Sequence, residues 1–241
     1  MPYRRLPNTD SARMRAMQKA LQIADKLPPY QLAYSVSTYQ ELKYFYPEFK
    51  QNVEYQKETL ERQTDKSKAH QNFQKKARLY ISHFIQVLNF AIARNEIKPE
   101  TRSYFGLEEY ESRLPNLYTE NEIISWGEKL IAGEQKRLSI GLSPITNPTI
   151  ARVKVHYEEF LREYKSHKYL QETNNKAIKK IAPLREKSDA IILKLWNEVE
   201  NTYANLELDE KRIKSAKYGI NYVYRKHEKL SFSNLKLDGV K

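Results

Sequence analysis

Hydrophobic residues recur every three or four positions through most of this chain. Between Tyr39 and Val53 the apolar positions are separated by 3, 4, 3 and 4 residues, and between Ile150 and His167 by 3, 4, 3, 4 and 3. This spacing places the apolar side chains on one face of an α-helix, where they can pack against a neighbour. Glycine, which tight β-turns often require, occurs only 6 times in the 241 residues. The pattern therefore predicts an all-α fold.

Local signals predict where several helices begin and end. The first helix is expected to begin near Thr9, a good N-cap residue, and to end before the proline pair at 28–29. Thr119 and Glu122 have the spacing of a capping box, so a connecting helix is expected to follow them. The next helix is expected to begin with Pro148 at its first position, where a missing N–H costs nothing.

Residues that disfavour helix interiors fall inside the periodic regions. Pro47 is expected to kink or split the first long helix, and a turn is expected near residues 64–65. Pro183 is expected to interrupt or restart the pattern in the second half. Gly127 and Gly133 lie within the connecting helix, where they are expected to mark the close approach of another helix. Each long periodic region is therefore predicted to be a hairpin of two helices.

The two periodic regions resemble each other at a shift of 111 positions. An aromatic-Gly-aliphatic triplet follows each region, at 105–107 and, with a small slip, at 218–220. The matched core positions include Tyr46 with Tyr157 and Ile81 with Ile192. Any two amphipathic helices can be slid into phase, but that alone does not place two such triplets in a chain with so few glycines. We therefore predict an internal duplication of a helical hairpin, packed as a helical bundle.

The predicted organisation is one compact domain with five parts. The parts are a basic N-terminal segment with the first helix at 1–33, a first hairpin at 34–118, a connecting helix at 119–145, a second hairpin at 146–226 and a polar tail at 227–241. The alternating segment at 218–225 is expected to contain a short extended stretch.

Positive charge exceeds negative charge, with 42 Lys and Arg against 30 Asp and Glu and a formal net charge of +12. Such an excess attracts polyanions, although it also serves solubility alone. The candidate polyanion contacts are the clustered cations and those beside tyrosines: Arg4, Arg5, Lys75, Lys76, Arg78, Lys179, Lys180, Arg185, Lys217, Arg225 and Lys226. The candidate aromatics for stacking on bases are Tyr3, Tyr222 and Tyr224. Tyrosine is also common at protein interfaces, which is the alternative interpretation of these rings.

No motif for catalysis or cofactor binding is visible. The chain has no Cys, which excludes disulfides, thiolate nucleophiles and Cys-ligated metals. It has no Gly-x-Gly-x-x-Gly, Gly-x-Ser-x-Gly or His-Glu-x-x-His motif, and no acidic residue stands three positions before any His. His167 continues an apolar stripe and is interpreted as a packed residue rather than a ligand. We therefore expect no enzyme activity, no cofactor and no metal.

Three stretches carry a resemblance to known sequences. They are Met-Pro-Tyr-Arg-Arg-Leu-Pro-Asn-Thr-Asp at 1–10, Tyr-Ile-Ser-His-Phe-Ile-Gln-Val-Leu-Asn at 80–89 and Tyr-Gly-Ile-Asn-Tyr-Val-Tyr-Arg at 218–225. Together they resemble an uncharacterised family of bacterial all-helical proteins. The resemblance implies a bacterial cytoplasmic origin and attaches no activity, ligand or site.

These observations predict a non-enzymatic interaction or scaffold protein of the bacterial cytoplasm, with a protein partner or self-association. The alternative is a nucleic-acid-binding protein that contacts the phosphate backbone without sequence specificity. The chain contains no run of 18 or more apolar residues, so no membrane span is expected. No apolar region follows Arg4 and Arg5, so no secretory signal is expected.

Overall fold

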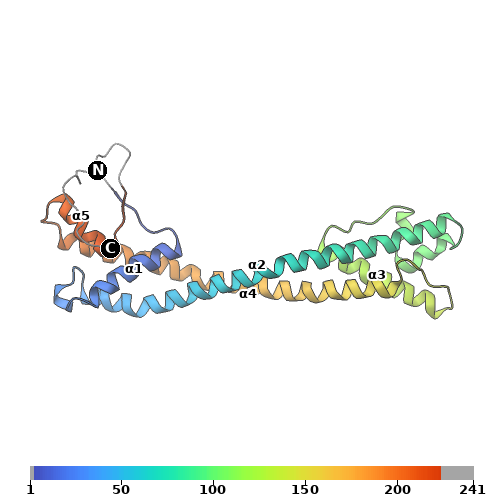
Figure 1. Ribbon diagram of the computed structural model, residues 1–241, viewed down its shortest axis with the longest axis horizontal. Coiled ribbons are helices and arrows are strands. Elements are labelled where there is room, and N and C mark those ends of the chain that lie inside the picture. The colour runs from blue at the N-terminus through green and yellow to red at the C-terminus, as the bar shows by residue number, and fades with distance from the viewer. Residues whose placement is uncertain (1–2, 224–241) are drawn as a thin grey trace, which may run out of the picture. The chain divides into compact units, whose positions relative to one another are not determined.

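The protein is all-α, as predicted, in a computed structural model that describes residues 3–223. Its elements, in chain order, are β1 (Tyr3–Arg4), α1 (Asp10–Ala24), η1 (Pro29–Gln31), α2 (Val36–Ala93), η2 (Pro99–Phe105), η3 (Glu108–Tyr110), α3 (Glu120–Ser139), α4 (Ile150–Thr202), α5 (Leu208–Lys217) and β2 (Tyr222–Val223). Figure 1 labels the α-helices, and α2 and α4 are the longest of those in the described residues. The strands β1 and β2 form one short antiparallel pair, so the extended stretch predicted near the C-terminus is confirmed.

The predicted helix starts are confirmed at two caps and corrected at a third. The Thr9 side chain accepts a hydrogen bond from the backbone N–H of Ala12 and caps α1. Thr119 and Glu122 form the predicted capping box at the start of α3. Pro148 does not occupy the first position of a helix, because it lies in a turn after a cis peptide bond and α4 begins at Ile150.

The two predicted hairpins are instead two unbroken helices. Helix α2 runs for 58 residues through Pro47 and through the turn predicted at 64–65, and α4 runs for 53 residues through Pro183. The Thr64 hydroxyl donates to the carbonyl of Leu60 inside the helix, and no glycine stands between residues 36 and 93 to end it. The helix-favouring residues on both sides therefore allow α2 to continue through residues 64–65, where the turn signal is weak. The internal duplication itself stays a prediction, with single long helices as the elements related by the shift.

The described chain forms two compact units rather than the single compact domain predicted. Unit 1 contains residues 3–57 and 176–223, and unit 2 contains residues Glu58–Asn175. Each unit contains part of α2 and part of α4 and has its own hydrophobic core.

In unit 1, α2 and α4 are antiparallel neighbours covered by α1. Lys194 of α4 pairs with Glu41 of α2 at 3.1 Å, while four residues later Glu198 accepts hydrogen bonds from the start of α2. Helix α1 buries Met17 in the core, together with Ala16 and Ala20. Small alanines allow α1 to approach closely, which completes the core of this unit.

In unit 2, the parts of α2 and α4 that lie in this unit form a core with α3, η2 and the segments beside them. A Cβ atom at Gly127 of α3 would collide with the ring of Tyr157 on α4, so the predicted close approach of a helix is confirmed there. A Cβ atom at Gly133 would collide with the backbone of Tyr104, which belongs to η2. Glycine therefore lets α3 contact both neighbours closely.

Candidate functional site

The predicted polyanion contact Arg4 is engaged within unit 1. Its guanidinium donates to Asn197 at 2.9 Å and to Glu200 at 3.0 Å, and it lies 6.0 Å from the ring centre of Trp196. The predicted stacking ring Tyr222 is half-buried and donates its hydroxyl to the same Glu200 at 2.6 Å. Burial, followed by this carboxylate, raises the pKa of Tyr222 above its ordinary value. Both residues therefore tie the β1–β2 pair to α4.

Arg185 is also engaged, in an ion pair that joins α4 to α1. Its guanidinium donates to both carboxylate oxygens of Asp10, at 2.9 and 2.7 Å. Next to it, Arg13 forms the same two-bond pair with Asp189 at 2.8 Å. These hydrogen bonds raise the pKa of both guanidinium groups. Arg185 therefore acts as a packing contact rather than as a free cation.

The other predicted contacts divide between the two units. In unit 2, Lys75, Lys76 and Arg78 are exposed on α2, and the Arg78 guanidinium lies 5.9 Å from the ring centre of Tyr118. In unit 1, the exposed predicted residues are Tyr3, Arg5, Lys179, Lys180 and Lys217. Tyr224, Arg225 and Lys226 lie outside the described residues. The described members of the predicted set are therefore split between the two units.

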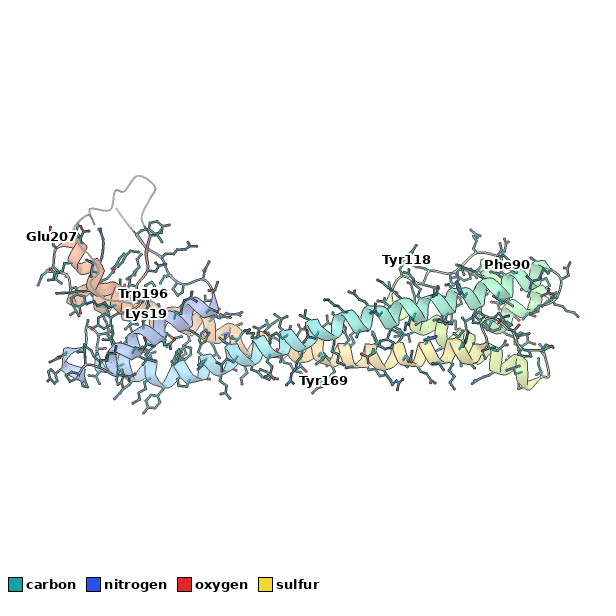
Figure 2. All side chains as sticks on the ribbon, viewed as in Figure 1. Lys19, Phe90, Tyr118, Tyr169, Trp196 and Glu207 are labelled. Carbon is teal, nitrogen blue, oxygen red and sulfur yellow. The ribbon has the colours of Figure 1, made fainter. Side chains whose placement is uncertain are left out.

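One predicted cation, Arg5, lies in a hollow of about 410 Å³ in unit 1 that we call the basic hollow. All three charged residues that line it are cations: Arg5, Arg15 and Lys19. Trp196 also lines it, and its indole Nε1 is buried without a hydrogen-bond partner among the described residues. Figure 2 labels Lys19 and Trp196 in this region. Sequence reasoning missed Arg15 and Lys19, although their spacing of four marks one face of α1.

A larger hollow of about 810 Å³ lies in unit 2 between the end of α2, η2 and the segment after α3, and we call it the apolar groove. Phe90, Ile140 and Leu142 line it and are 60%, 57% and 40% exposed. Figure 2 shows Phe90 near the end of α2. Sequence reasoning missed this surface, because Ile140 and Leu142 belong to no periodic stripe, although they lie within the connecting helix predicted at 119–145; the helix itself ends at Ser139.

A buried ion pair holds one wall of the apolar groove in place. Arg137 pairs with Glu134, and both side chains are almost fully buried. Glu134 also accepts a hydrogen bond from the backbone N–H of Ile145 at 2.8 Å, and Arg137 donates to the carbonyl of Ser143 at 3.1 Å. These bonds attach the segment around 143–145 to α3, so that the groove keeps its shape.

Three helices of unit 2 bring together His70, Glu120 and His167, which we call the His-Glu cluster. One potential ligand atom from each residue lies within 4.8 Å of the other two. His70 Nε2 lies 2.6 Å from Glu120 Oε1, and the two imidazole rings stack with their centres 4.6 Å apart. The side chain of His70 is 5% exposed, and Lys168 Nζ lies 3.3 Å from the other oxygen of Glu120.

The cluster has a distinct electrostatic character. Burial alone would raise the pKa of Glu120, but hydrogen bonds from His70 and Lys168 outweigh it and lower that pKa. Burial, with the neighbouring His70, lowers the pKa of His167. The Nδ1 atoms of both imidazoles are buried without hydrogen-bond partners among the described residues. No local motif could reveal this cluster, because its members lie on three different helices, with 50 positions between His70 and Glu120 and 47 between Glu120 and His167.

Comparison with family models, with curated proteins and with solved structures gave no match. Among residues 3–223, no helix combines the length and apolarity needed to cross a membrane.

Proposed function

We propose that this chain is a non-enzymatic, self-associating scaffold protein of the cytoplasm, and that the apolar groove of unit 2 is its interface. The observation that carries this proposal is the exposure of Phe90, Ile140 and Leu142 around one hollow. Large apolar side chains gathered at a concave surface gain free energy when a partner removes them from water. Phe90 is the expected anchor, because aromatic residues that enter a pocket dominate interface energies.

The charges at the groove favour a second copy of the same chain as the partner. Arg94, Glu96, Lys98 and Glu100 line it, so that cations and carboxylates alternate along the chain. Arg94 and Glu96 pair with each other at 2.7 Å, which leaves Lys98 and Glu100 without an ion-pair partner among the described residues. Across a two-fold axis, Lys98 of each copy would face Glu100 of the other, which makes the surface complementary to itself.

The test is the oligomeric state of the full chain, measured by sedimentation equilibrium over a concentration series. We expect a dimer for the wild type and a dissociation constant at least about ten-fold higher for Phe90→Asp, the equivalent of about 1.4 kcal/mol. The matched control is Tyr169→Asp, since Tyr169 is a 69% exposed aromatic residue on a helix of the same unit. A wild type that stays monomeric, or equal weakening by both variants, would overturn the proposal.

A second function, binding of nucleic acid through its phosphates, is supported by the basic hollow. Arg5, Arg15 and Lys19 line a concave surface on which no acidic residue is found, so their fields add there. The logarithm of such a binding constant falls linearly with the logarithm of the salt concentration, with a slope of nearly one per phosphate contact.

Titration of single-stranded and duplex DNA at several salt concentrations tests this function. The double variant Arg15→Ala/Lys19→Ala is expected to reduce the salt slope by up to about two. The charge-matched control is Lys179→Ala/Lys180→Ala, which removes two exposed cations of α4 that do not line the hollow. Equal slopes for the two double variants would reject the hollow as the contact, and no binding at low salt would reject the function.

A further inference from the structure

We propose that the His-Glu cluster binds one divalent transition-metal ion, such as Zn²⁺, through His70, Glu120 and His167. Two imidazole nitrogens and one carboxylate oxygen are a donor set that Zn²⁺ and its neighbours in the first transition row accept readily. The three donors come from α2, α3 and α4, and one atom from each lies within 4.8 Å of the others. An ion at this point would link three helices of unit 2.

The hydrogen bonding of the two histidines favours a ligand site over simple packing. A buried imidazole normally has partners for both ring nitrogens. Here the Nδ1 atoms of both His70 and His167 are buried and unpartnered among the described residues. Two adjacent imidazoles that each leave a buried nitrogen without a hydrogen-bond partner are costly as packing alone, and an unprotonated imidazole nitrogen has a lone pair that can coordinate a metal ion.

Binding of an ion at the cluster requires a rearrangement of its side chains. Around a tetrahedral Zn²⁺ with bonds of about 2 Å, neighbouring donor atoms are about 3.3 Å apart. The 2.6 Å between His70 Nε2 and Glu120 Oε1 therefore has to lengthen, and the donor atom of His167 has to be brought to a similar distance from both. The two rings are parallel within 2°, and parallel stacked rings cannot both direct a lone pair at one ion. His167 is the less buried of the two, so its ring is the one expected to rotate. Glu120 is held at the first position of α3 by the capping box behind it.

Lys168 is the competitor of the metal ion. Its ammonium group lies 3.3 Å from Glu120 Oε2, and a dication beside Glu120 would repel it. The side chain of Lys168 is 43% exposed, so it can turn toward water when an ion binds. Three protein ligands leave a fourth position for a water molecule or for the hydroxyl of Ser67, which lies 3.3 Å from His167 Nε2.

The test uses the untagged full-length chain, stripped of metal, with Co²⁺ as the spectroscopic probe and Zn²⁺ as its competitor. We expect one equivalent of Co²⁺ to produce the visible absorption bands of a four- or five-coordinate ion, and one equivalent of Zn²⁺ to abolish them. His167→Gln should weaken binding at least about ten-fold, and Lys168→Met should strengthen it. His70→Gln should abolish binding. If that variant does not fold because His70 is buried, the variant of the half-buried His167 still tests the site.

The matched control is His156→Gln. His156 pairs with Glu159 at 3.2 Å and stacks on Tyr80, so it is a second His-carboxylate pair in the same unit without a second imidazole. This variant should bind Co²⁺ as the wild type does. Absence of stoichiometric Co²⁺ and Zn²⁺ binding to the wild type, or equal weakening by His156→Gln and His167→Gln, would overturn the proposal. Dimerisation through the apolar groove is a separate measurement, so either proposal can fail without the other.

Discussion

The side-chain amide of Asn174 on α4 donates a hydrogen bond of 2.9 Å to the side-chain carbonyl of Gln63 on α2, and the two residues stand 111 positions apart. This separation equals the shift at which the two halves of the sequence match. The contact lies within unit 2, where Thr59 also donates to Asn174 at 3.3 Å. A polar contact therefore sits in the helix–helix interface at residues that the predicted duplication treats as equivalent.

We predict that exchanging these two amides preserves the contact. Gln63→Ala and Asn174→Ala should each lower the free energy of unfolding by about 1 kcal/mol, because each leaves an amide partner unpaired. The exchanged double variant Gln63→Asn/Asn174→Gln should recover most of that loss, since one long and one short amide still span the gap. Urea denaturation of the variants and the wild type measures this coupling. An exchanged variant less stable than both alanine variants would contradict the prediction.

The pH dependence of unit 2 should show the burial of Tyr157. Burial, followed by the neighbouring Glu128, raises the pKa of Tyr157 from 10.0 to about 12. A raised pKa means that the unfolded chain loses this proton first, so the stabilisation is complete below pH 10 and is lost as the pH rises through 12. Melting temperatures between these limits should fall less steeply for Tyr157→Phe than for the wild type. Parallel profiles of melting temperature against pH for the two proteins would show that Tyr157 does not contribute to the pH dependence of stability.

The buried ion pair behind the apolar groove should be sensitive to the loss of one charge. Glu134→Gln leaves Arg137 charged and buried, which we expect to cost about 3–5 kcal/mol in unfolding free energy. The control is Glu96→Gln, because Glu96 forms a pair of 2.7 Å with Arg94 at the surface, where water screens the charges. Guanidinium denaturation should show a large loss for the first variant and little change for the second. Similar losses in both would place the stabilisation elsewhere.

Two glycines have left-handed backbones, but only one of them is closely packed, so their alanine variants distinguish the cost of backbone strain from the cost of a steric clash. Gly219 has a φ of +92°, and a Cβ atom there would lie 2.7 Å from the carbonyl oxygen of Ala16. Gly141 has a φ of +80° with open space around the same position. Gly141→Ala should cost about 1–2 kcal/mol from backbone strain alone, and Gly219→Ala should cost more because it also pushes α1 away. Thermal unfolding of the two variants measures which loses more stability. Equal losses would show that α1 can move to accommodate the added methyl group without further cost.

Part of the candidate sites was predictable because it depends on neighbours in sequence. Arg5 was selected as a polyanion contact from its place beside Tyr3 and Arg4, and it lines the basic hollow. Arg4 was selected by the same reasoning and Arg185 from its place in a basic cluster with Lys179 and Lys180, yet both form ion pairs with acidic residues 196 and 175 positions away. The composition gives the number of cations, while the fold determines which cations are paired with acidic side chains.

The sequence by itself determined the helical class, the caps at Thr9 and Thr119 and the apolar faces, because these depend on interactions within one or two helical turns. It did not determine that α2 passes through residues 64–65 without a turn, since contacts between helices decide whether a weak break becomes a loop. Only the tertiary structure brought His70, Glu120 and His167 together and left Phe90 exposed beside Ile140. Such clusters depend on how distant helices pack, and periodicity along the chain carries no information about which helix a face will meet.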